Sequence, residues 1–200
     1  MAILQIDTSK YTHLHFAFAT ITTDYKVNIS GVEAQFARFA ALKGVKRILS
    51  FGGWTFSTSR DTYAIFRDAV TDANRNLFAD NCVQFLLDSG LDGIDFDWEY
   101  PGAPDTNSEI PPASPADGMN YAKFLGRVRT GLNARAPGKS LFVAMPASYW
   151  YLKGFPVGVM APILDYVVFM AYDLHGQYDY GNKWAQAGCP LGNCHVIRQT

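Results

Sequence analysis

Apolar and polar residues alternate along residues 93–99, which makes this stretch the clearest strand pattern in the chain. Successive side chains of a strand point to opposite faces. The even-numbered positions hold isoleucine, phenylalanine and tryptophan, which are expected to face a packed layer. The odd-numbered positions hold three acids, Asp95, Asp97 and Glu99, which are therefore predicted to share one polar face.

Four further short apolar segments also read as strands, and four segments with apolar residues at three- and four-residue spacing read as helices. The expected strands span 14–19, 46–51, 93–99, 141–146 and 165–172, and the expected helices span 32–42, 61–70, 74–88 and 115–133. Strands that alternate with helices predict a parallel sheet of βα units. A Pro-rich stretch at 101–115 is expected to form a long loop in the wall of a cleft.

Parallel βα units either close into a barrel or form an open, doubly wound sheet. No G-x-G-x-x-G or phosphate-binding loop opens any of these helices, which disfavours nucleotide binding. The candidate site residues instead follow the carboxyl ends of three strands, at residues 52–54, 99 and 172–173, as is typical of the (β/α)8 barrel. The pattern yields five strands where such a barrel has eight, so the sequence predicts an incomplete TIM barrel of the α/β class with exposed sheet edges.

The three acids point to proton chemistry. Carboxylates about 7 Å apart along a strand cannot all ionise in a partly enclosed site without a large penalty, so one is expected to hold a proton near neutral pH. A protonated carboxyl beside an ionised one suits acid catalysis. A hard-cation site and a structural role are the alternatives. Large apolar residues between the acids, in place of the glycines of a calcium loop, favour catalysis, and no metal or other cofactor is predicted.

Composition narrows the class of protein. A chain of 200 residues with a net charge of -1 and 48% hydrophobic residues fits one soluble globular domain, and neither nucleic acid nor a membrane surface is suggested as a partner. No apolar run approaches the length of about 20 residues that spans a bilayer. Residues 1–10 lack the basic and apolar regions of a secretory signal. Nothing in the sequence indicates an oligomeric state.

The cysteines and two of the histidines offer weaker signals. Cys82 precedes an apolar run and reads as a small buried hydrophobe. Cys189 and Cys194 flank a turn-rich segment that could bring them within bridging range, which leaves a disulfide open if the chain is exported. His13 and His15 have no acidic partner nearby in the sequence and are expected to be structural.

The acidic strand, read as D-G-x-D-x-D-x-E over residues 92–99, resembles the signature of glycoside hydrolase family 18, the chitinases and related enzymes. Residues 50–53 resemble the family's S-x-G-G motif, and residues 170–173 resemble its M-x-Y-D motif. Segments 144–156 and 172–177 are most similar to the fungal killer-toxin-like branch. The resemblance implies that residues 1–200 are a partial catalytic domain, whose five strands correspond to the second through sixth of the barrel.

The resemblance also implies a retaining hydrolysis of β-1,4-linked N-acetylglucosamine polymers in which the substrate's acetamido group takes part. Glu99 would act as the acid and base, and Asp97 would orient the acetamido group. Asp95 would share a proton with Asp97. Tyr172 would donate a hydrogen bond to the acetamido oxygen.

Further positions correspond to residues that contact sugar in relatives: Gly52, Gly53, Trp54, Tyr100, Met170 and Asp173. Two of these, Trp54 and Met170, could equally belong to the core. Asp92 is out of phase with the polar face and is expected to fix the start of the strand. The implied partner is chitin or its oligosaccharides, in an extracellular or wall-associated setting. An endo-β-N-acetylglucosaminidase acting on N-glycans and a non-catalytic, lectin-like chitin-binding fragment are the alternatives.

Overall fold

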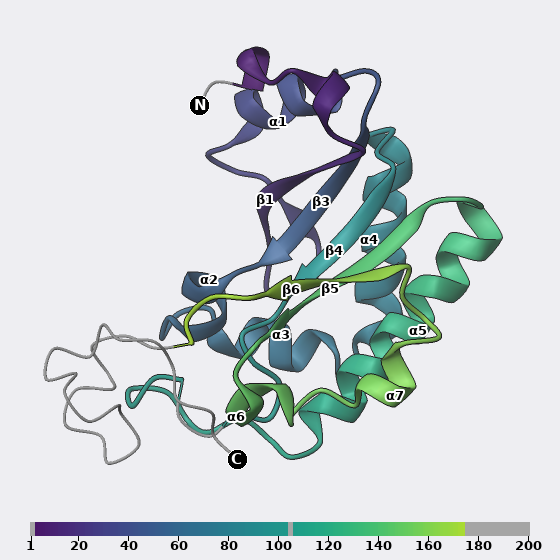
Figure 1. Cartoon of the computed structure of the whole chain (residues 1–200). Coiled ribbons are helices and arrows are strands. Elements are labelled where there is room, and N and C mark those ends of the chain that lie inside the picture. Colours follow the sequence, from purple (N-terminus) through teal and green to yellow (C-terminus); the bar gives the residue numbers. More distant parts are fainter. Residues whose placement is uncertain (1–2, 104–105, 175–200) are drawn as a thin grey trace, which may run out of the picture.

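A single sheet organises the part of the chain that the computed structural model describes, residues 3–103 and 106–174 (Figure 1). The strand order is β2-β1-β3-β4-β5-β6. The strands span His13–Ile21 (β1), Val27–Asn28 (β2), Lys46–Gly52 (β3), Gly93–Asp97 (β4), Ser140–Pro146 (β5) and Tyr166–Met170 (β6). All neighbours pair in parallel except β2, which runs antiparallel to the end of β1. The five predicted parallel strands are thus confirmed, and β2 was missed because two residues give no alternation.

The acidic strand is shorter than predicted. β4 ends at Asp97, so Glu99 lies beyond the strand rather than within it. The backbone leaves the ladder here because other groups take over its hydrogen bonds. The Gly53 N–H donates to the carbonyl of Asp97 at 2.8 Å, and the Glu99 N–H donates to the hydroxyl of Ser57 at 3.0 Å.

All four predicted helices form, with bounds shifted by at most two residues. The helices span Glu33–Ala40 (α1), Trp54–Thr58 (α2), Tyr63–Ala69 (α3), Arg75–Asp88 (α4), Asp117–Arg135 (α5), Tyr149–Leu152 (α6) and Val157–Met160 (α7), and 3-10 turns span Ile3–Gln5 and Thr8–Lys10. The unpredicted α2, α6 and α7 are too short to show a helical period. In the described part of the chain, no helix is long and apolar enough to cross a membrane.

Local sequence explains where the two long helices begin and end. α4 ends at Asp88, and Gly90, two residues later, has a φ of 63° that a side chain would disfavour. The N–H groups of Gly90 and Leu91 return to the carbonyls of Leu87 and Leu86, which closes the last turn. α5 has Asp117 in its first turn and Arg135 in its last, and both charges interact favourably with the helix dipole.

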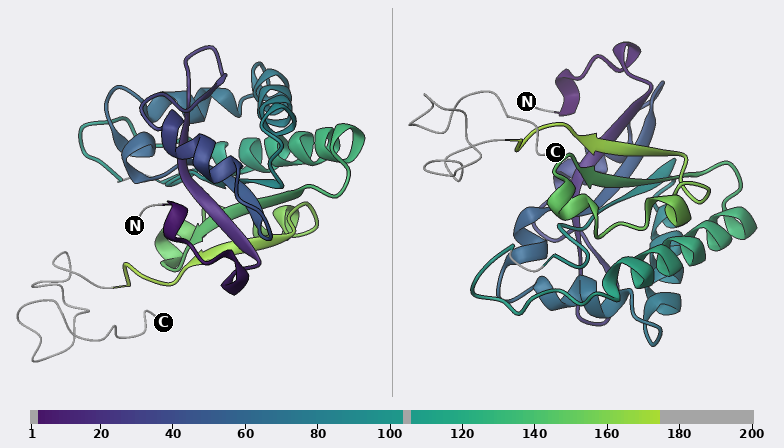
Figure 2. Two further views of the ribbon diagram at one scale, coloured as in Figure 1. Left: turned by 90° about the horizontal axis from the view of Figure 1, so that it is seen from above. Right: turned by 60° about the horizontal axis from the view of Figure 1, so that its bottom comes forward.

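An aromatic layer fills the space between the sheet and the helices. Phe96 of β4 stacks on Phe51 of β3 with ring centroids 5.3 Å apart, and it meets Phe124 of α5 edge-on at 4.9 Å. Phe78 of α4 stacks on Phe124 at 4.6 Å. α4 and α5 lie side by side along this face of the sheet (Figure 2). Burial of each such ring contributes about 1.5–3 kcal/mol, so this face anchors the strands that carry the acids.

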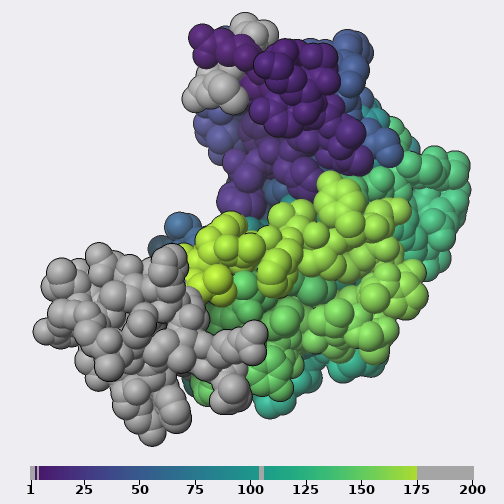
Figure 3. All heavy atoms as spheres, viewed as in Figure 1, coloured from purple at the N-terminus to yellow at the C-terminus, as the bar shows by residue number. Residues whose placement is uncertain are grey.

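The opposite face of the sheet is polar and aromatic. Ser50, Asp95, Phe142 and Tyr166 are in register across β3, β4, β5 and β6, and therefore share this face. The edge of the sheet at β6 is less covered, since Phe169 on its outer side is 58% exposed. Residues around β6 form part of the molecular surface (Figure 3). The exposed flank expected of an incomplete barrel is thus present at β6.

Candidate active site

The first two acids of β4 lie on the inner face of the sheet and are almost completely buried. Asp95 is 4% exposed and Asp97 is 7% exposed. The Ser50 hydroxyl donates to Asp95 Oδ2 at 2.7 Å, and His15 Nδ1 lies 3.1 Å from the same oxygen. Asp95 Oδ1 and Asp97 Oδ1 are buried with no hydrogen-bond partner among the described residues. Two buried carboxyl groups therefore share one face of a strand, and in the described part of the chain no Lys or Arg side chain pairs with either.

This arrangement favours a proton on Asp97. Burial, followed by the charges of Glu99 and Asp95, raises the pKa of Asp97 to about 8. Burial also raises the pKa of Glu99, although a hydrogen bond with Tyr100 acts in the opposite direction. The site thus holds carboxyl groups whose proton affinities differ from those of free acids, as acid catalysis near neutral pH needs. The expectation of a protonated acid near neutral pH agrees with this geometry.

Two glycines let the strand ends approach each other closely. A Cβ atom on Gly52 would lie 2.3 Å from the backbone oxygen of Asp97, and one on Gly53 would lie 2.8 Å from the ring of Phe18. Both glycines also have positive φ angles, 106° and 82°. They are buried and lie outside the described pocket lining, so the structure gives them a role in placing Asp97.

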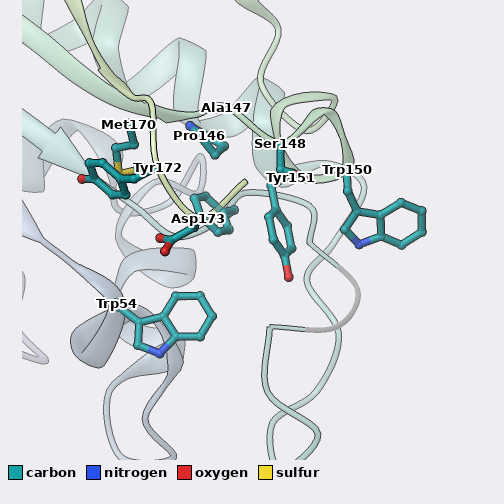
Figure 4. Close-up of a pocket in the computed structure, with 10 residues that line it drawn as sticks. Trp54, Pro146, Ala147, Ser148, Trp150, Tyr151, Met170, Tyr172 and Asp173 are labelled. Carbon is teal, nitrogen blue, oxygen red and sulfur yellow. The ribbon is translucent and has the colours of Figure 1, made fainter. Parts of the chain in front are cut away.

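A pocket of about 570 Å³ opens at the carboxyl ends of the strands (Figure 4). Its described lining consists of Trp54, Tyr100, Pro146, Ala147, Ser148, Trp150, Tyr151, Met170, Tyr172 and Asp173. The Tyr100 ring stacks on Tyr151 with centroids 4.5 Å apart, and it lies 6.4 Å from the Trp54 ring. Aromatic rings in a row provide flat apolar surfaces of the kind on which sugar rings pack.

The M-x-Y-D segment brings its side chains to the same pocket from the end of β6. Met170 is 7% exposed, whereas Tyr172 is 63% exposed. Burial and then the charges of Asp97 and Glu99 raise the pKa of Tyr172. Asp173 adopts a φ of 53°, a left-handed conformation that Asp tolerates better than most residues. Its charge also raises the pKa of Glu99.

The structure therefore brings most of the predicted site together. Trp54, Tyr100, Met170, Tyr172 and Asp173 line one pocket, and electrostatic coupling links that pocket to the buried acids. Trp54 is 48% exposed and so is not a core residue, while Met170 is both buried and pocket-lining.

His15 has an acidic partner that is distant in the sequence, Asp95, 80 residues away. In the described part of the loop at 101–115, Pro101, Gly102, Ala103 and Pro115 line a second hollow together with Trp150 and Tyr151. Farther along the loop, Asn107 donates to the carbonyl of Thr58 at 2.9 Å, and Arg67 donates to that of Pro111. These hydrogen bonds hold the loop against α2 and α3, whereas the pocket wall comes from α6 and the residues before it.

The α6 residues Trp150 and Tyr151 were not predicted as site residues. Figure 4 shows Tyr151 and Trp150 on the side of the pocket away from Met170. A stretch of three successive aromatic residues, 149–151, was the signal in the sequence, but a four-residue helix has no period that would reveal which of them faces a cleft.

Other predicted residues have structural roles or lie outside the described residues. Asp92 bonds Arg47 at 2.9 Å and Lys139 at 3.1 Å, which fixes the start of β4 as expected. Cys82 is buried, as expected. The proposed pair Cys189 and Cys194 lies outside the described residues. Within the described ranges, no three His, Cys, Asp or Glu side chains are grouped so as to hold a metal ion.

Comparison with known proteins identifies the family. The chain matches Glycosyl hydrolases family 18 over residues 2–192. It is 48% identical over 194 residues to "Secreted chitinase LysM12" of Penicillium expansum, which covers 96% of this chain but 13% of that protein. It is 44% identical to "Killer toxin subunits alpha/beta" of Kluyveromyces lactis, which covers 97% of this chain and 16% of that protein.

Solved structures agree on the fold. Catalytic domain 2 of the Group II chitinase of Ostrinia furnacalis superposes with a TM-score of 0.78 at 28% identity, over 90% of this chain and 48% of that one. The chain thus spans a small part of its curated relatives and about half of this solved domain. The parallel sheet and its likeness to chitinase structures identify the fold as an incomplete TIM barrel, and the similarity to the killer toxin agrees with the killer-toxin-like branch. This chain belongs to family 18 of the glycosyl hydrolases.

Proposed function

We propose that Asp97 and Glu99 are catalytic residues of a chitinase, which hydrolyses β-1,4-linked N-acetylglucosamine polymers with retention of configuration. The observation that carries the proposal is the site at the carboxyl end of β4. There Asp97, with its pKa raised to about 8, and Glu99 lie close to an aromatic pocket. On this proposal, residues 1–200 form part of a catalytic domain whose remaining strands complete the barrel.

In the first step Glu99 donates its proton to the glycosidic oxygen. The acetamido oxygen of the same sugar forms a bond to the anomeric carbon while the bond to the leaving saccharide breaks. The product is an oxazolinium ion on the substrate. Asp97 orients the acetamido group and stabilises its positive charge, and Tyr172 donates a hydrogen bond to the acetamido oxygen.

In the second step the Glu99 carboxylate accepts a proton from water as the water oxygen attacks the anomeric carbon. The oxazolinium ring opens, the acetamido group is restored, and Glu99 regains the proton it gave away. Two displacements at one carbon leave the configuration unchanged. Asp95 is the partner with which Asp97 shares its proton.

The same mechanism defines the substrate class, because the reacting sugar must carry a 2-acetamido group. The half-exposed Trp54 offers a ring face for a neighbouring sugar, and the stacked pair Tyr100 and Tyr151 lines the same pocket. One solved relative, from Ostrinia furnacalis, is described as a complex with an N-acetylchitooligosaccharide, (NAG)5. We propose chitin or chitooligosaccharides as the ligand, and an extracellular setting in line with the secreted Penicillium relative.

The test is hydrolysis of a fluorogenic N,N'-diacetylchitobioside by the purified chain and by Glu99→Gln. Removal of a general acid is expected to lower the rate by at least about 10²-fold. Glu109→Gln is the matched control, because this glutamate pairs with Arg60 at the surface at 3.7 Å and lies outside the pocket. Circular dichroism establishes that all three proteins are folded. Equal rates for the parent and Glu99→Gln would refute the assignment.

Chitin binding without catalysis is the second candidate, favoured by the aromatic pocket together with the exposed edge at β6. It predicts a folded parent that is retained on chitin beads and hydrolyses nothing. Release of glycan from an N-glycoprotein, with no cleavage of chitooligosaccharides, would instead favour an endo-β-N-acetylglucosaminidase. The same three purified proteins distinguish these outcomes.

A further inference from the structure

One histidine on the inner face of the sheet connects the buried acids to the opposite edge of the barrel. His15 of β1 places Nδ1 3.1 Å from Asp95 Oδ2, and its Nε2 lies 3.0 Å from the hydroxyl of Tyr166 on β6. Three side chains from three strands thus form a continuous chain, Tyr166, His15 and Asp95. None of the three family motifs, at residues 50–53, 92–99 and 170–173, includes His15 or Tyr166.

From this geometry we infer that His15 is a positioning residue for the reaction: its Nδ1 proton is donated to Asp95, and its Nε2 is oriented by Tyr166. The inference rests on the proposed function, because Asp95 acts through Asp97.

The hydrogen-bond partners determine the position of the ring proton. A carboxylate oxygen is an acceptor, so Nδ1 must carry the proton that bridges to Asp95 Oδ2. In the neutral ring Nε2 is then an acceptor, and it receives the hydrogen of the Tyr166 hydroxyl. In the charged ring Nε2 donates to the Tyr166 oxygen instead. In both charge states the Nδ1 N–H donates to Asp95, and the Tyr166 hydroxyl can form a hydrogen bond with Nε2.

The bond to Asp95 affects where the shared proton of the acid pair resides. Oδ2 of Asp95 receives two donors, His15 and the Ser50 hydroxyl at 2.7 Å, while Oδ1 has no partner among the described residues. Hydrogen bonds to a carboxylate stabilise its charged form. In the free protein these two donors therefore leave the proton of the pair to Asp97, which faces the acetamido group in the proposed reaction.

The surroundings of His15 contain few other titratable groups. Asp95 faces it from β4, Tyr166 faces it from β6, and His13 lies two residues away on β1. β3 contributes the Ser50 hydroxyl at 3.4 Å, and β5 contributes the Phe142 ring at 5.4 Å. Lys46 acts on His13, whose pKa is lowered first by burial and then by that charge. A pH effect through His15 would therefore act on Asp95.

The first arm of the test is ¹⁵N NMR of the histidine side chains of the full chain, assigned with His15→Asn. The expected result is a protonated Nδ1 and an unprotonated Nε2 on the neutral His15 ring. Tyr166→Phe removes the donor to Nε2, so the Nε2 resonance is expected to shift. An unprotonated Nδ1 on the neutral ring would overturn the inference, as would an Nε2 resonance unchanged by Tyr166→Phe.

The second arm is the pH dependence of kcat/KM on chitooligosaccharides. His15→Asn is expected to move the acidic limb of the profile to higher pH by about one unit, since the acid pair then loses a donor that stabilises its charged form. His13→Asn is the matched control, because that ring bonds Thr12 at 3.0 Å and contacts no acid. Superimposable pH profiles for the parent and His15→Asn would contradict the inference.

The two arms separate this inference from the proposed function. A parent that hydrolyses no chitooligosaccharide argues against activity of this chain, and the NMR arm still decides the position of the His15 proton. If the parent is active but its neutral His15 ring carries the proton on Nε2, the proposed function stands and the positioning role of His15 is refuted.

Discussion

The two ends of β4 carry acids in opposite electrostatic surroundings. At the amino end, Asp92 meets the Arg47 guanidinium at 2.9 Å and the Lys139 ammonium at 3.1 Å. Partial burial raises the pKa of Asp92, but hydrogen bonds from Arg47 and Lys139 outweigh burial and lower it. At the carboxyl end, Asp97 has no cation beside it among the described residues, and its pKa rises to about 8.

This difference shows how one strand separates stability from chemistry. The paired acid at the amino end tethers β4 to the start of β3 and to the chain before β5, so its charge stabilises the fold. The acids at the carboxyl end are kept without such partners, which weakens the fold but leaves protons available for reaction. Barrel enzymes place their active sites at this same carboxyl end.

Asp97→Asn should have the largest effect at the reactive end. The amide cannot pass a proton to Asp95 and so cannot become the anion that stabilises the oxazolinium ion. Hydrolysis of chitooligosaccharides is therefore expected to fall by about 10²–10³-fold. Stability should not fall, because no buried charge remains to be desolvated. Activity assays and urea denaturation of the same preparation check both statements. Lower stability at all pH values would show that Asp97 is a structural acid.

The pH dependence of stability gives the next effect. An acid with a higher pKa in the folded than in the unfolded state stabilises the fold while it is protonated. For Asp97 this contribution is complete below about pH 4 and is lost as the pH rises to about 8. The unfolding free energy of the parent should fall across this window relative to that of Asp97→Asn, by on the order of a few kcal/mol. Parallel curves for the two proteins would contradict the raised pKa.

Asp92→Asn should affect stability at the amino end of β4 and leave the reaction unchanged. It removes a carboxylate that accepts from the Arg47 backbone, its guanidinium and Lys139, so the free energy of unfolding is expected to fall by about 1–3 kcal/mol. The kcat of the folded protein should stay within about twofold of the parent. Chemical denaturation and a rate assay measure the two quantities. A large loss of kcat with unchanged stability would reverse the roles of the two ends.

Trp54→Ala is expected to have the smallest effect, and on binding rather than stability. The indole is 48% exposed, so the free energy of unfolding should change by less than about 0.5 kcal/mol. Loss of a ring face should weaken the binding of chitopentaose about tenfold. Tyr11→Ala is the control, because Tyr11 is 49% exposed and lies outside the pocket. Equal weakening by both substitutions would exclude a specific platform.

The sequence was sufficient for the acidic face because a strand's period of two residues assigns each side chain to a face without further information. It was insufficient for His15, whose contact with Asp95 depends on the relative placement of β1 and β4. Tyr151 was missed for the same reason, since its stacking on Tyr100 joins a short helix to a loop. Local periodicity thus predicted the acids and strands, while contacts between distant segments had to come from the structure.

We propose that the carboxyl end of β4 catalyses substrate-assisted hydrolysis. ¹H NMR of chitopentaose with the purified chain tests this mechanism, because the anomeric configuration of the first products is visible before mutarotation. The new reducing ends should first appear as the β-anomer, since two displacements occur at one carbon. First appearance of the α-anomer would rule this mechanism out, because it would require direct attack by water.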